Sequence, residues 1–105
     1  MKFERTPAFD ADFRRLKREH QRTFRRVVVE SFAPACDAYV AALPASFRWP
    51  SGLRVSAIKG SASIMEMTWS FASPDGRATF EFVTVDGEIR CRWRRVGDHD
   101  VFDRP

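Results

Sequence analysis

Apolar and polar residues alternate along the second half of the chain, from Gly52 to Pro105. A period of two is typical of β-strands, because successive side chains point to opposite faces of a sheet. Runs rich in glycine, serine, proline and aspartate separate the alternating segments, as turns do, and Asp86-Gly87 is a strong signal for a tight hairpin. The pattern predicts strands over residues 53–59, 62–71, 77–85 and 88–96.

The first half of the chain has apolar residues at helical spacing, after a short strand predicted over residues 2–5. Thr6 and Pro7 suit the start of a helix, because threonine caps free amide groups of the first turn and proline fits the first helical position. The buried face of this helix is expected to comprise Phe9, Phe13 and Leu16.

A second helix is predicted over about residues 21–32. Pro34 is expected to interrupt or kink it, because proline lacks the amide hydrogen that an inner helical turn needs. Apolar residues continue the helical stripe beyond this point, at Cys36, Tyr39, Val40 and Leu43. The first half therefore predicts two antiparallel helices, the second of them kinked.

Together these elements predict one α+β domain over residues 1–105, with a short strand, a helical hairpin and then an antiparallel β-meander. One face of the meander is apolar, and the helices must cover it because their own apolar stripes need a partner. The opposite face is expected to be open. It carries Arg54, Glu66, Thr68, Arg77, Thr79, Glu81, Arg90, Arg92 and Arg94.

Five arginines and two glutamates make this open face basic. Guanidinium groups bind phosphates through paired hydrogen bonds, so the face suggests a site for a phosphate-bearing partner, above all RNA. The alternative is an ordinary solvated face on which arginine and glutamate pair across strands. A second basic zone on the helices is either solvated or docks to ribosomal RNA phosphates. It comprises Arg14, Arg15, Lys17, Arg18, Arg22, Arg25 and Arg26.

The composition fits a small folded domain. With 105 residues, of which 44% are hydrophobic, the chain can bury a core without metals or disulfides. The net charge of +4 is by itself a weak sign of a polyanionic partner. Cys36 and Cys91 are expected to be reduced core thiols, with a disulfide between them as the alternative. No signal peptide or membrane-spanning segment is recognisable, so a cytoplasmic location is expected.

Several common chemistries lack support in the sequence. Two histidines and two cysteines do not have the spacing of a structural zinc site. There is no Walker-type glycine loop, no dinucleotide fingerprint and no serine nucleophile motif. Neither a metal nor a cofactor is therefore expected.

Several segments, taken in order, have the character of one known family. They are Leu53-Arg54-Val55 leading into Gly60, Met65 to Trp69, Asp75 to Phe80, and Gly97 to Phe102. With the opening strand and the helical hairpin, they make nearly the whole chain resemble the RelE/ParE toxin superfamily. The resemblance implies a small basic fold like that of microbial ribonucleases and silencing by a cognate antitoxin. RelE-type members cut mRNA in the ribosomal A site without a metal, whereas ParE-type members poison DNA gyrase.

The resemblance also suggests which residues act. Arg54, Arg77 and Arg92 stand where sheet arginines of RelE-like enzymes occur, and His99 stands where a terminal acid or base occurs.

The chain departs from the lysine-and-tyrosine version of the family. Lys59 is the only lysine of the second half, and Phe102 occupies a place where many relatives have tyrosine. A phenylalanine ring can stack on a base but cannot transfer a proton. Either a glutamate-and-histidine variant of the chemistry operates or catalysis has been lost.

Metal-free RNA cleavage needs a base for the 2′-hydroxyl, cations around the phosphorus and an acid for the leaving oxygen. Glu66 is the candidate base, Arg77 the candidate catalytic cation and His99 the candidate acid, because histidine titrates near neutral pH. Two alternatives stay open: Glu66 merely neutralises a neighbouring arginine, and His99 merely braces the chain. RNA-binding roles are assigned to Arg54, Arg90, Arg92, Arg94 and Phe102.

The leading expectation is the toxin of a type II toxin–antitoxin pair, acting as a ribosome-dependent mRNA endonuclease. Its partners would be a cognate antitoxin, mRNA and the ribosome, with no membrane. The alternatives are a ParE-like inhibitor of DNA gyrase and a non-catalytic module that binds an antitoxin.

Overall fold

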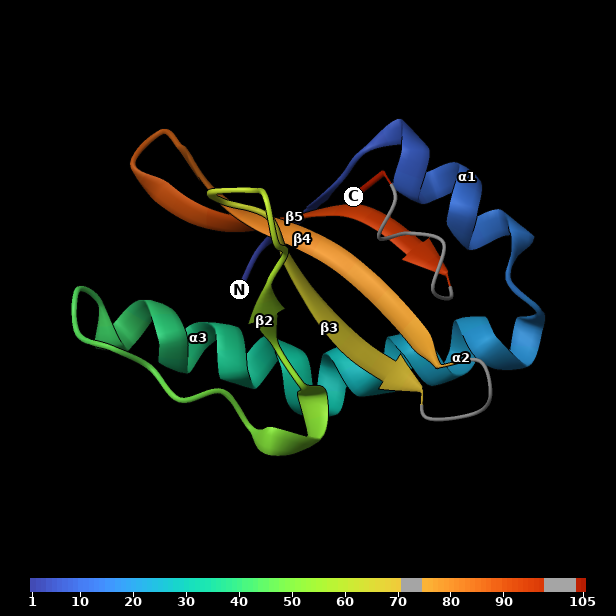
Figure 1. Ribbon diagram of the computed structural model, residues 1–105, viewed down its shortest axis with the longest axis horizontal. Helices are drawn as coiled ribbons and strands as arrows, with labels where there is room; N and C mark the ends of the chain where they lie inside the picture. Colours follow the sequence, from blue (N-terminus) through green and yellow to red (C-terminus); the bar gives the residue numbers. More distant parts are fainter. Residues whose placement is uncertain (71–74, 98–103) are drawn as a thin grey trace.

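A five-stranded sheet is the framework of the protein in a computed structural model that describes residues 1–70, 75–97 and 104–105 (Figure 1). Its strands are β1 (Phe3–Arg5), β2 (Ser56–Ala57), β3 (Met65–Ser70), β4 (Gly76–Val85) and β5 (Glu88–Gly97). Their order across the sheet is β1-β5-β4-β3-β2. Strands β2 to β5 form the predicted antiparallel meander, whereas β1 lies parallel to β5. The α+β class is therefore confirmed, with a mixed sheet.

Helices cover the apolar face of this sheet. They are α1 (Pro7–Arg15), α2 (Arg18–Val27) and α3 (Ala33–Ala42). Helix α1 begins as predicted, because Oγ1 of Thr6 accepts a hydrogen bond of 3.1 Å from the amide of Phe9. The same hydroxyl donates to the carbonyl of Arg94 at 2.8 Å, which joins the start of α1 to β5. No helix in the described residues is long and apolar enough to span a bilayer.

Helices α2 and α3 form one continuous rod, joined by a π-helical turn over Val28–Phe32 (Figure 1). Within this turn the amide of Ala33 donates to the carbonyl of Val28, five residues earlier. Pro34 follows directly, and its ring would crowd the carbonyl four residues before it in a regular α-helix. The wider π turn occurs where the ring of Pro34 would otherwise clash with this carbonyl. The regular α-helix is interrupted by this π turn just before Pro34, but a complete break does not occur, because the rod continues as α3.

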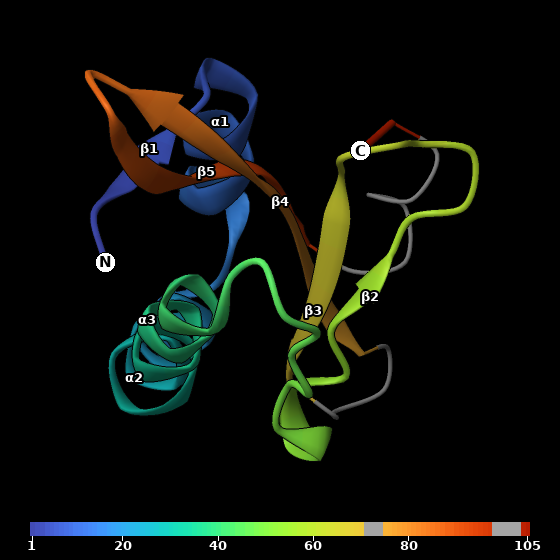
Figure 2. The same ribbon diagram turned by 90° about the vertical axis from the view of Figure 1, so that its left-hand side faces the viewer.

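Trp93 of β5 lies at the centre of the core, only 3% exposed. The centroids of five phenylalanine rings lie 4.9–5.9 Å from the indole, and each ring comes from a different element: β1, α1, α2, the π turn and β4. They are Phe3, Phe9, Phe24, Phe32 and Phe80. Figure 2 shows the rod on one side of the strands.

The segment 53–59 is mostly not a strand, which corrects the prediction. Ser51–Leu53 form a 3₁₀ turn, and Arg54 ends it in the left-handed region with φ of 46°. Extended pairing needs negative φ, so strand β2 begins only at Ser56. Arg54 therefore does not occupy the predicted position on the sheet. It lies exposed at the end of the 3₁₀ turn.

Two β-bulges change which side chains share a face. In β5, Trp93 lies opposite Phe80 and Arg95 lies opposite Thr79, so Arg94 is the extra residue. Strict alternation would place Arg95 on the apolar face, but an inserted residue shifts the alternation by one position. Val96 is consequently buried in the core. A second bulge lies in β3 between Thr68 and Ser70.

Gly76 begins β4 beneath the ring of Trp69. A Cβ atom on Gly76 would lie 2.5 Å from Cε2 of the indole, well inside van der Waals contact. The indole is fixed there by a hydrogen bond of 3.0 Å from Nε1 to the carbonyl of Arg77. Only glycine therefore fits at position 76.

Gly76→Ala is expected to lower the free energy of unfolding by about 1–3 kcal/mol, because the new methyl group overpacks a buried ring. Urea denaturation measures the loss. Gly52→Ala is the matched control, because a Cβ at Gly52 meets no atom within 4 Å. Equal stability of the two variants would contradict the close packing of Gly76 against Trp69.

Candidate functional site

The sheet face away from the helices brings most of the predicted polar residues together, and we call it the arginine face. Glu66 on β3 lies opposite Thr79 on β4, and Glu81 on β4 lies opposite Arg92 on β5. The described members of the arginine face are Glu4, Glu66, Arg77, Thr79, Glu81, Arg90, Arg92 and Arg94. The predicted site residues His99 and Phe102 lie outside the described residues.

Glu66 and Arg77 are adjacent, as the predicted catalytic roles require. Oε1 of Glu66 lies 3.6 Å from Nη1 of Arg77. The hydroxyl of Ser56 donates to the same Oε1 at 3.2 Å, and Nη2 of Arg77 lies 3.5 Å from Asp75. The side chains of Glu66 and Arg77 are 15% and 14% exposed, so both reach solvent through a limited opening. The pairing fits both a held catalytic base and the simpler role of charge neutralisation.

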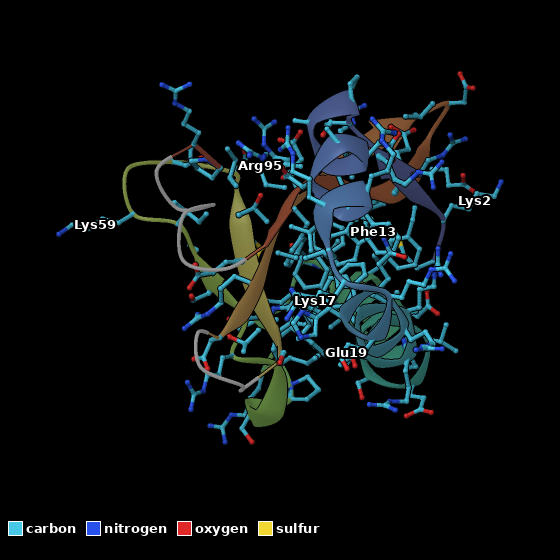
Figure 3. The ribbon with its side chains drawn as sticks, turned by 90° about the vertical axis from the view of Figure 1, so that its right-hand side faces the viewer. Lys2, Phe13, Lys17, Glu19, Lys59 and Arg95 are labelled. Carbon is cyan, nitrogen blue, oxygen red and sulfur yellow. The ribbon has the colours of Figure 1, made fainter. Side chains whose placement is uncertain are left out.

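A hollow of about 420 Å³ adjoins Glu66. Ala57, Ile58 and Lys59 form the rest of its lining. Lys59 follows β2, and its side chain projects outward from the molecule (Figure 3). A mobile ammonium at the rim can meet a phosphate that enters the hollow. Lys59 was not among the predicted site residues, although it is the only lysine of the second half of the chain.

The three predicted RNA-binding arginines of β5 are paired with carboxylates. Glu4 of β1 accepts two hydrogen bonds from Arg92, at 3.1 and 2.9 Å, and one from Arg90 at 3.2 Å. Arg94 donates to Glu81 at 3.1 Å. The hydrogen bond from Arg92, with a further contribution from Arg90, lowers the pKa of Glu4 below its usual value.

Two further glutamates pair with these arginines, and the sequence did not place the first of them, Glu4, on this face. Glu4 reaches the arginine face because β1 lies beside β5, and Glu88 accepts a hydrogen bond of 2.9 Å from Nε of Arg90. This bond lowers the pKa of Glu88 and raises that of Arg90. The predicted excess of positive charge is consequently largely cancelled along β5. Here the geometry matches the alternative of cross-strand pairing.

The end of the chain occupies part of the arginine face. The carbonyl oxygen of Pro105 accepts hydrogen bonds from Oγ1 of Thr79 (3.1 Å) and from Nε of Arg94 (3.0 Å). Thr79 is fully buried and Thr68 nearly so. The expectation of a wholly open face is therefore wrong around these two threonines.

Asp12 of α1 holds the bulged segment of β5. It accepts two hydrogen bonds from Arg95, at 2.6 and 3.0 Å, and one of 3.2 Å from the amide of Val96. The hydrogen bond raises the pKa of Arg95. Arg95 also donates to the carbonyl of Arg104 at 3.1 Å. Asp12 and Arg95 therefore help to place the end of the chain on the sheet, a role that the sequence analysis missed.

The basic zone on the helices differs from the arginine face. Arg15 lies 3.6 Å from Asp12, but its neighbours form no ion pair within residues 1–70, 75–97 and 104–105. These exposed side chains are Arg14, Lys17, Arg18, Arg22, Arg25 and Arg26. Lys17 lies where α1 gives way to α2 (Figure 3).

Cys36 and Cys91 are fully buried free thiols, as predicted. Burial raises the pKa of the Cys91 thiol, and a hydrogen bond with Cys36 adds to the effect. A thiol held in its protonated form is a poor nucleophile. Among the described side chains, no group of three or more histidines, cysteines, aspartates or glutamates lies together in a way that would hold a metal ion.

Comparisons with known proteins assign no family. No family model matches the chain, and no curated protein matches it. Among solved structures, the solution structure of a conserved hypothetical protein from Helicobacter pylori, HP0894, is similar. It shares 16% identity and a TM-score of 0.44 over 95% of this chain and 96% of that one. Similarity at this level says nothing about function.

Glu4→Gln is expected to lower stability at neutral pH and to lose its effect in acid. The folded-state pKa of Glu4 lies below the unfolded value of 4.5, so its stabilising contribution is present above that pH. The contribution disappears as the pH falls through the folded-state value. Urea midpoints of the native chain and the variant should therefore converge on acidification. A gap that stays constant with pH would contradict the ion pairs of Glu4, and Glu19→Gln, an exposed carboxylate on α2, is the control.

Asp12→Ala is expected to lower the free energy of unfolding by about 3 kcal/mol, because it leaves a buried arginine contact and a strand amide without their acceptor. Asp10→Ala is the control, since its ion pair with Arg5 is exposed and should contribute less than about 1 kcal/mol. Urea denaturation compares the two. Similar losses would show that Asp12 does not hold the bulge.

Proposed function

We propose that the protein is a RelE/ParE-like toxin whose arginine face carries a metal-free endoribonuclease site at Glu66. The supporting observation is a hollow lined by Glu66 and Lys59, with the Arg77 guanidinium 3.6 Å from the Glu66 carboxylate. Glu66 is held by Ser56 and Arg77, and Lys59 lines the rim. The order of the chain's elements, which resembles that of the RelE/ParE superfamily, adds to this support.

Each residue has a distinct role in the proposed reaction. Glu66 takes the proton of a 2′-hydroxyl, whose oxygen then attacks the adjacent phosphorus. Arg77 and Lys59 stabilise the negative charge that builds up on the phosphoryl oxygens. The bond to the 5′-oxygen breaks as that oxygen gains a proton, which leaves a cyclic phosphate and a free 5′-hydroxyl. His99 is the proposed donor of this proton, on the strength of the sequence alone.

The substrate and partners follow from the same proposal. The substrate is mRNA on the ribosome, and a cognate antitoxin silences the toxin. The pairs that Glu4 and Glu81 make with the β5 arginines limit the cations available to RNA, which agrees with a need for the ribosome to position the substrate.

A non-catalytic binding module is the second candidate. The carboxylate partners of Arg90, Arg92 and Arg94 favour it, because these arginines are already neutralised within the protein. A ParE-like inhibitor of DNA gyrase belongs to this class.

Glu66→Gln is expected to reduce mRNA cutting by about 10²–10⁴-fold, because the amide retains the shape of the side chain but cannot accept the proton. Induced expression followed by mapping of mRNA 5′ ends measures cutting. Glu30→Gln, an exposed carboxylate on the helical rod, is the control and should cut normally. His99→Ala tests the proposed acid in the same assay.

Undiminished cutting by Glu66→Gln would remove the carboxylate from the mechanism. Growth arrest by the native chain without new mRNA ends would reject the nuclease altogether. A supercoiling assay would then test gyrase, and harmless expression without an antitoxin would favour a plain binding module.

A further inference from the structure

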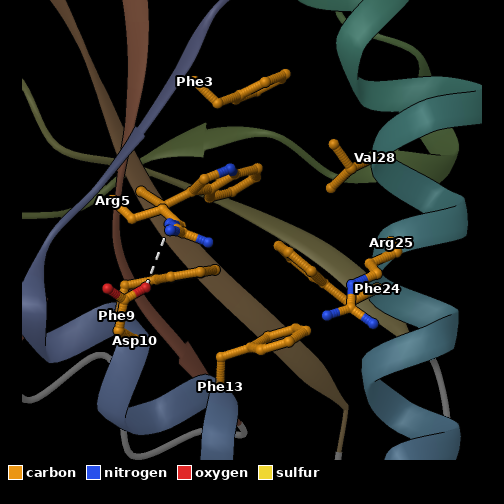
Figure 4. A pocket seen from close by; sticks show the side chains of 9 residues that line it. Phe3, Arg5, Phe9, Asp10, Phe13, Phe24, Arg25 and Val28 are labelled. Carbon is orange, nitrogen blue, oxygen red and sulfur yellow. Dashed lines mark ion pairs between the residues drawn. The ribbon is translucent and has the colours of Figure 1, made fainter.

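An aromatic cleft lies between α1 and α2, on the helical side of the sheet (Figure 4). Its volume of about 370 Å³ lies within the range of small-ligand sites. One wall is a ladder of nearly parallel rings, with centroids 5.8–6.0 Å apart and planes 10–22° apart. The rings of this ladder are Phe3, Trp93, Phe9 and Phe13. Phe24 and Val28 face them from the rod (Figure 4).

The mouth of the aromatic cleft carries both hydrogen-bond donors and an acceptor. Nε of Arg5 lies 3.3 Å from Oδ1 of Asp10, and both side chains are well exposed (Figure 4). On the opposite rim, the guanidinium carbon of Arg25 lies 4.9 Å from the centroid of the Phe13 ring. A cation–π contact of this kind holds a guanidinium at the rim without neutralising it.

Arg25 also belongs to a row of exposed arginines along α2, which we call the helix row. Its members recur at helical intervals, so they share one side of the rod over about 12 Å. They are Arg18, Arg22, Arg25 and Arg26. None of them pairs with a carboxylate anywhere in the described ranges, in contrast to the β5 arginines. A row of arginines without carboxylate partners in the described residues therefore lies beside the aromatic cleft.

We propose that the aromatic cleft and the helix row bind a single-stranded nucleic acid. One base enters the mouth of the cleft against its partly buried lining residues Phe3, Phe13 and Val28, and the backbone phosphates lie along the helix row. Sites for single strands combine a positively charged track with aromatic side chains that take up bases, and both parts meet here at Arg25. This site lies on the other side of the sheet from Glu66 and does not depend on cleavage there.

Asp10 decides between a nucleic acid and an acidic peptide as the occupant. A nucleobase presents both acceptors and amino donors on its edge, so Arg5 and Asp10 can each find a partner. An acidic side chain of a peptide would be repelled by the Asp10 carboxylate at the same rim. The mixed polarity of the mouth therefore fits a base better than an anionic side chain.

A labelled single-stranded DNA of mixed sequence tests the proposal by fluorescence anisotropy. It has no 2′-hydroxyl, so failure to bind it is distinct from failure of the proposed RNA cleavage. Val28→Phe fills the aromatic cleft and should weaken binding about five- to a hundredfold, the range for losing one stacked base. Arg22→Gln and Arg25→Gln should each weaken binding and lower the slope of affinity against salt by about 0.7.

Matched controls separate the cleft from general effects. Val29→Phe adds the same ring at a neighbouring position that is 71% exposed, and it should leave affinity unchanged. Arg48→Gln removes an exposed arginine from the connector after α3 and should also have no effect. Urea midpoints confirm that each variant is folded.

Three results would overturn the proposal. The first is undiminished binding by folded Val28→Phe. The second is competition by inorganic polyphosphate, which has no bases, as strong as that of unlabelled single strand at equal charge. The third is binding of a synthetic peptide rich in glutamate and leucine when the single strand does not bind. Quenching of Trp93 fluorescence by the single strand, lost in Val28→Phe, would support it, because the indole forms part of the cleft wall.

Discussion

The fold depends on the packing of one indole. Trp93 sits on β5, and five elements each place one phenylalanine ring against it. Each such pair contributes about 0.5–1.5 kcal/mol beyond the burial of apolar area. The carbonyl of Trp93 also accepts a hydrogen bond of 3.0 Å from the amide of Thr6, which fixes the chain between β1 and α1. Both surfaces for which a function is proposed depend on this arrangement. The ring ladder of the aromatic cleft passes through Trp93, and the bulge that follows it turns Arg94 and Arg95 towards the end of the chain.

Local patterns were enough to predict the fold class and most of the elements. The cap at Thr6, the hairpin at Asp86-Gly87 and the extent of β4 depend on neighbouring residues, and the structure confirms them. The errors arose where backbone geometry overrode the pattern. Arg54 adopts a left-handed conformation that no alternation reveals, and the π turn carries the rod past Pro34. Strict alternation cannot predict a bulge either, because the inserted residue moves the side chains that follow it to the opposite face of the sheet.

The site was harder to predict because its charges come from distant parts of the chain. The sequence correctly brought Glu66 and Arg77 together, since both lie in one antiparallel pair. It did not bring Glu4 to the arginines of β5, because that contact needs a parallel pairing between the two ends of the chain. Asp12 offered a signal, since a carboxylate three residues after Phe9 falls within the apolar stripe of α1 and must find a buried partner. The charged residues of a sheet surface can therefore be counted from the sequence. Which carboxylates pair with its arginines cannot be predicted in this way.

The parallel pairing of β1 with β5 has a consequence for biosynthesis. The hydroxyl of Thr6 bonds to a carbonyl 88 residues further along the chain, and β5 is the only strand beside β1 in the described part of the chain. In a nascent polypeptide, β1 therefore stays unpaired and its aromatic side chain unshielded until β5 has been translated. A product that terminates before β5 lacks Trp93, the residue at the centre of the core. For a protein proposed to be harmful to its own cell, incomplete translation then yields no folded toxin.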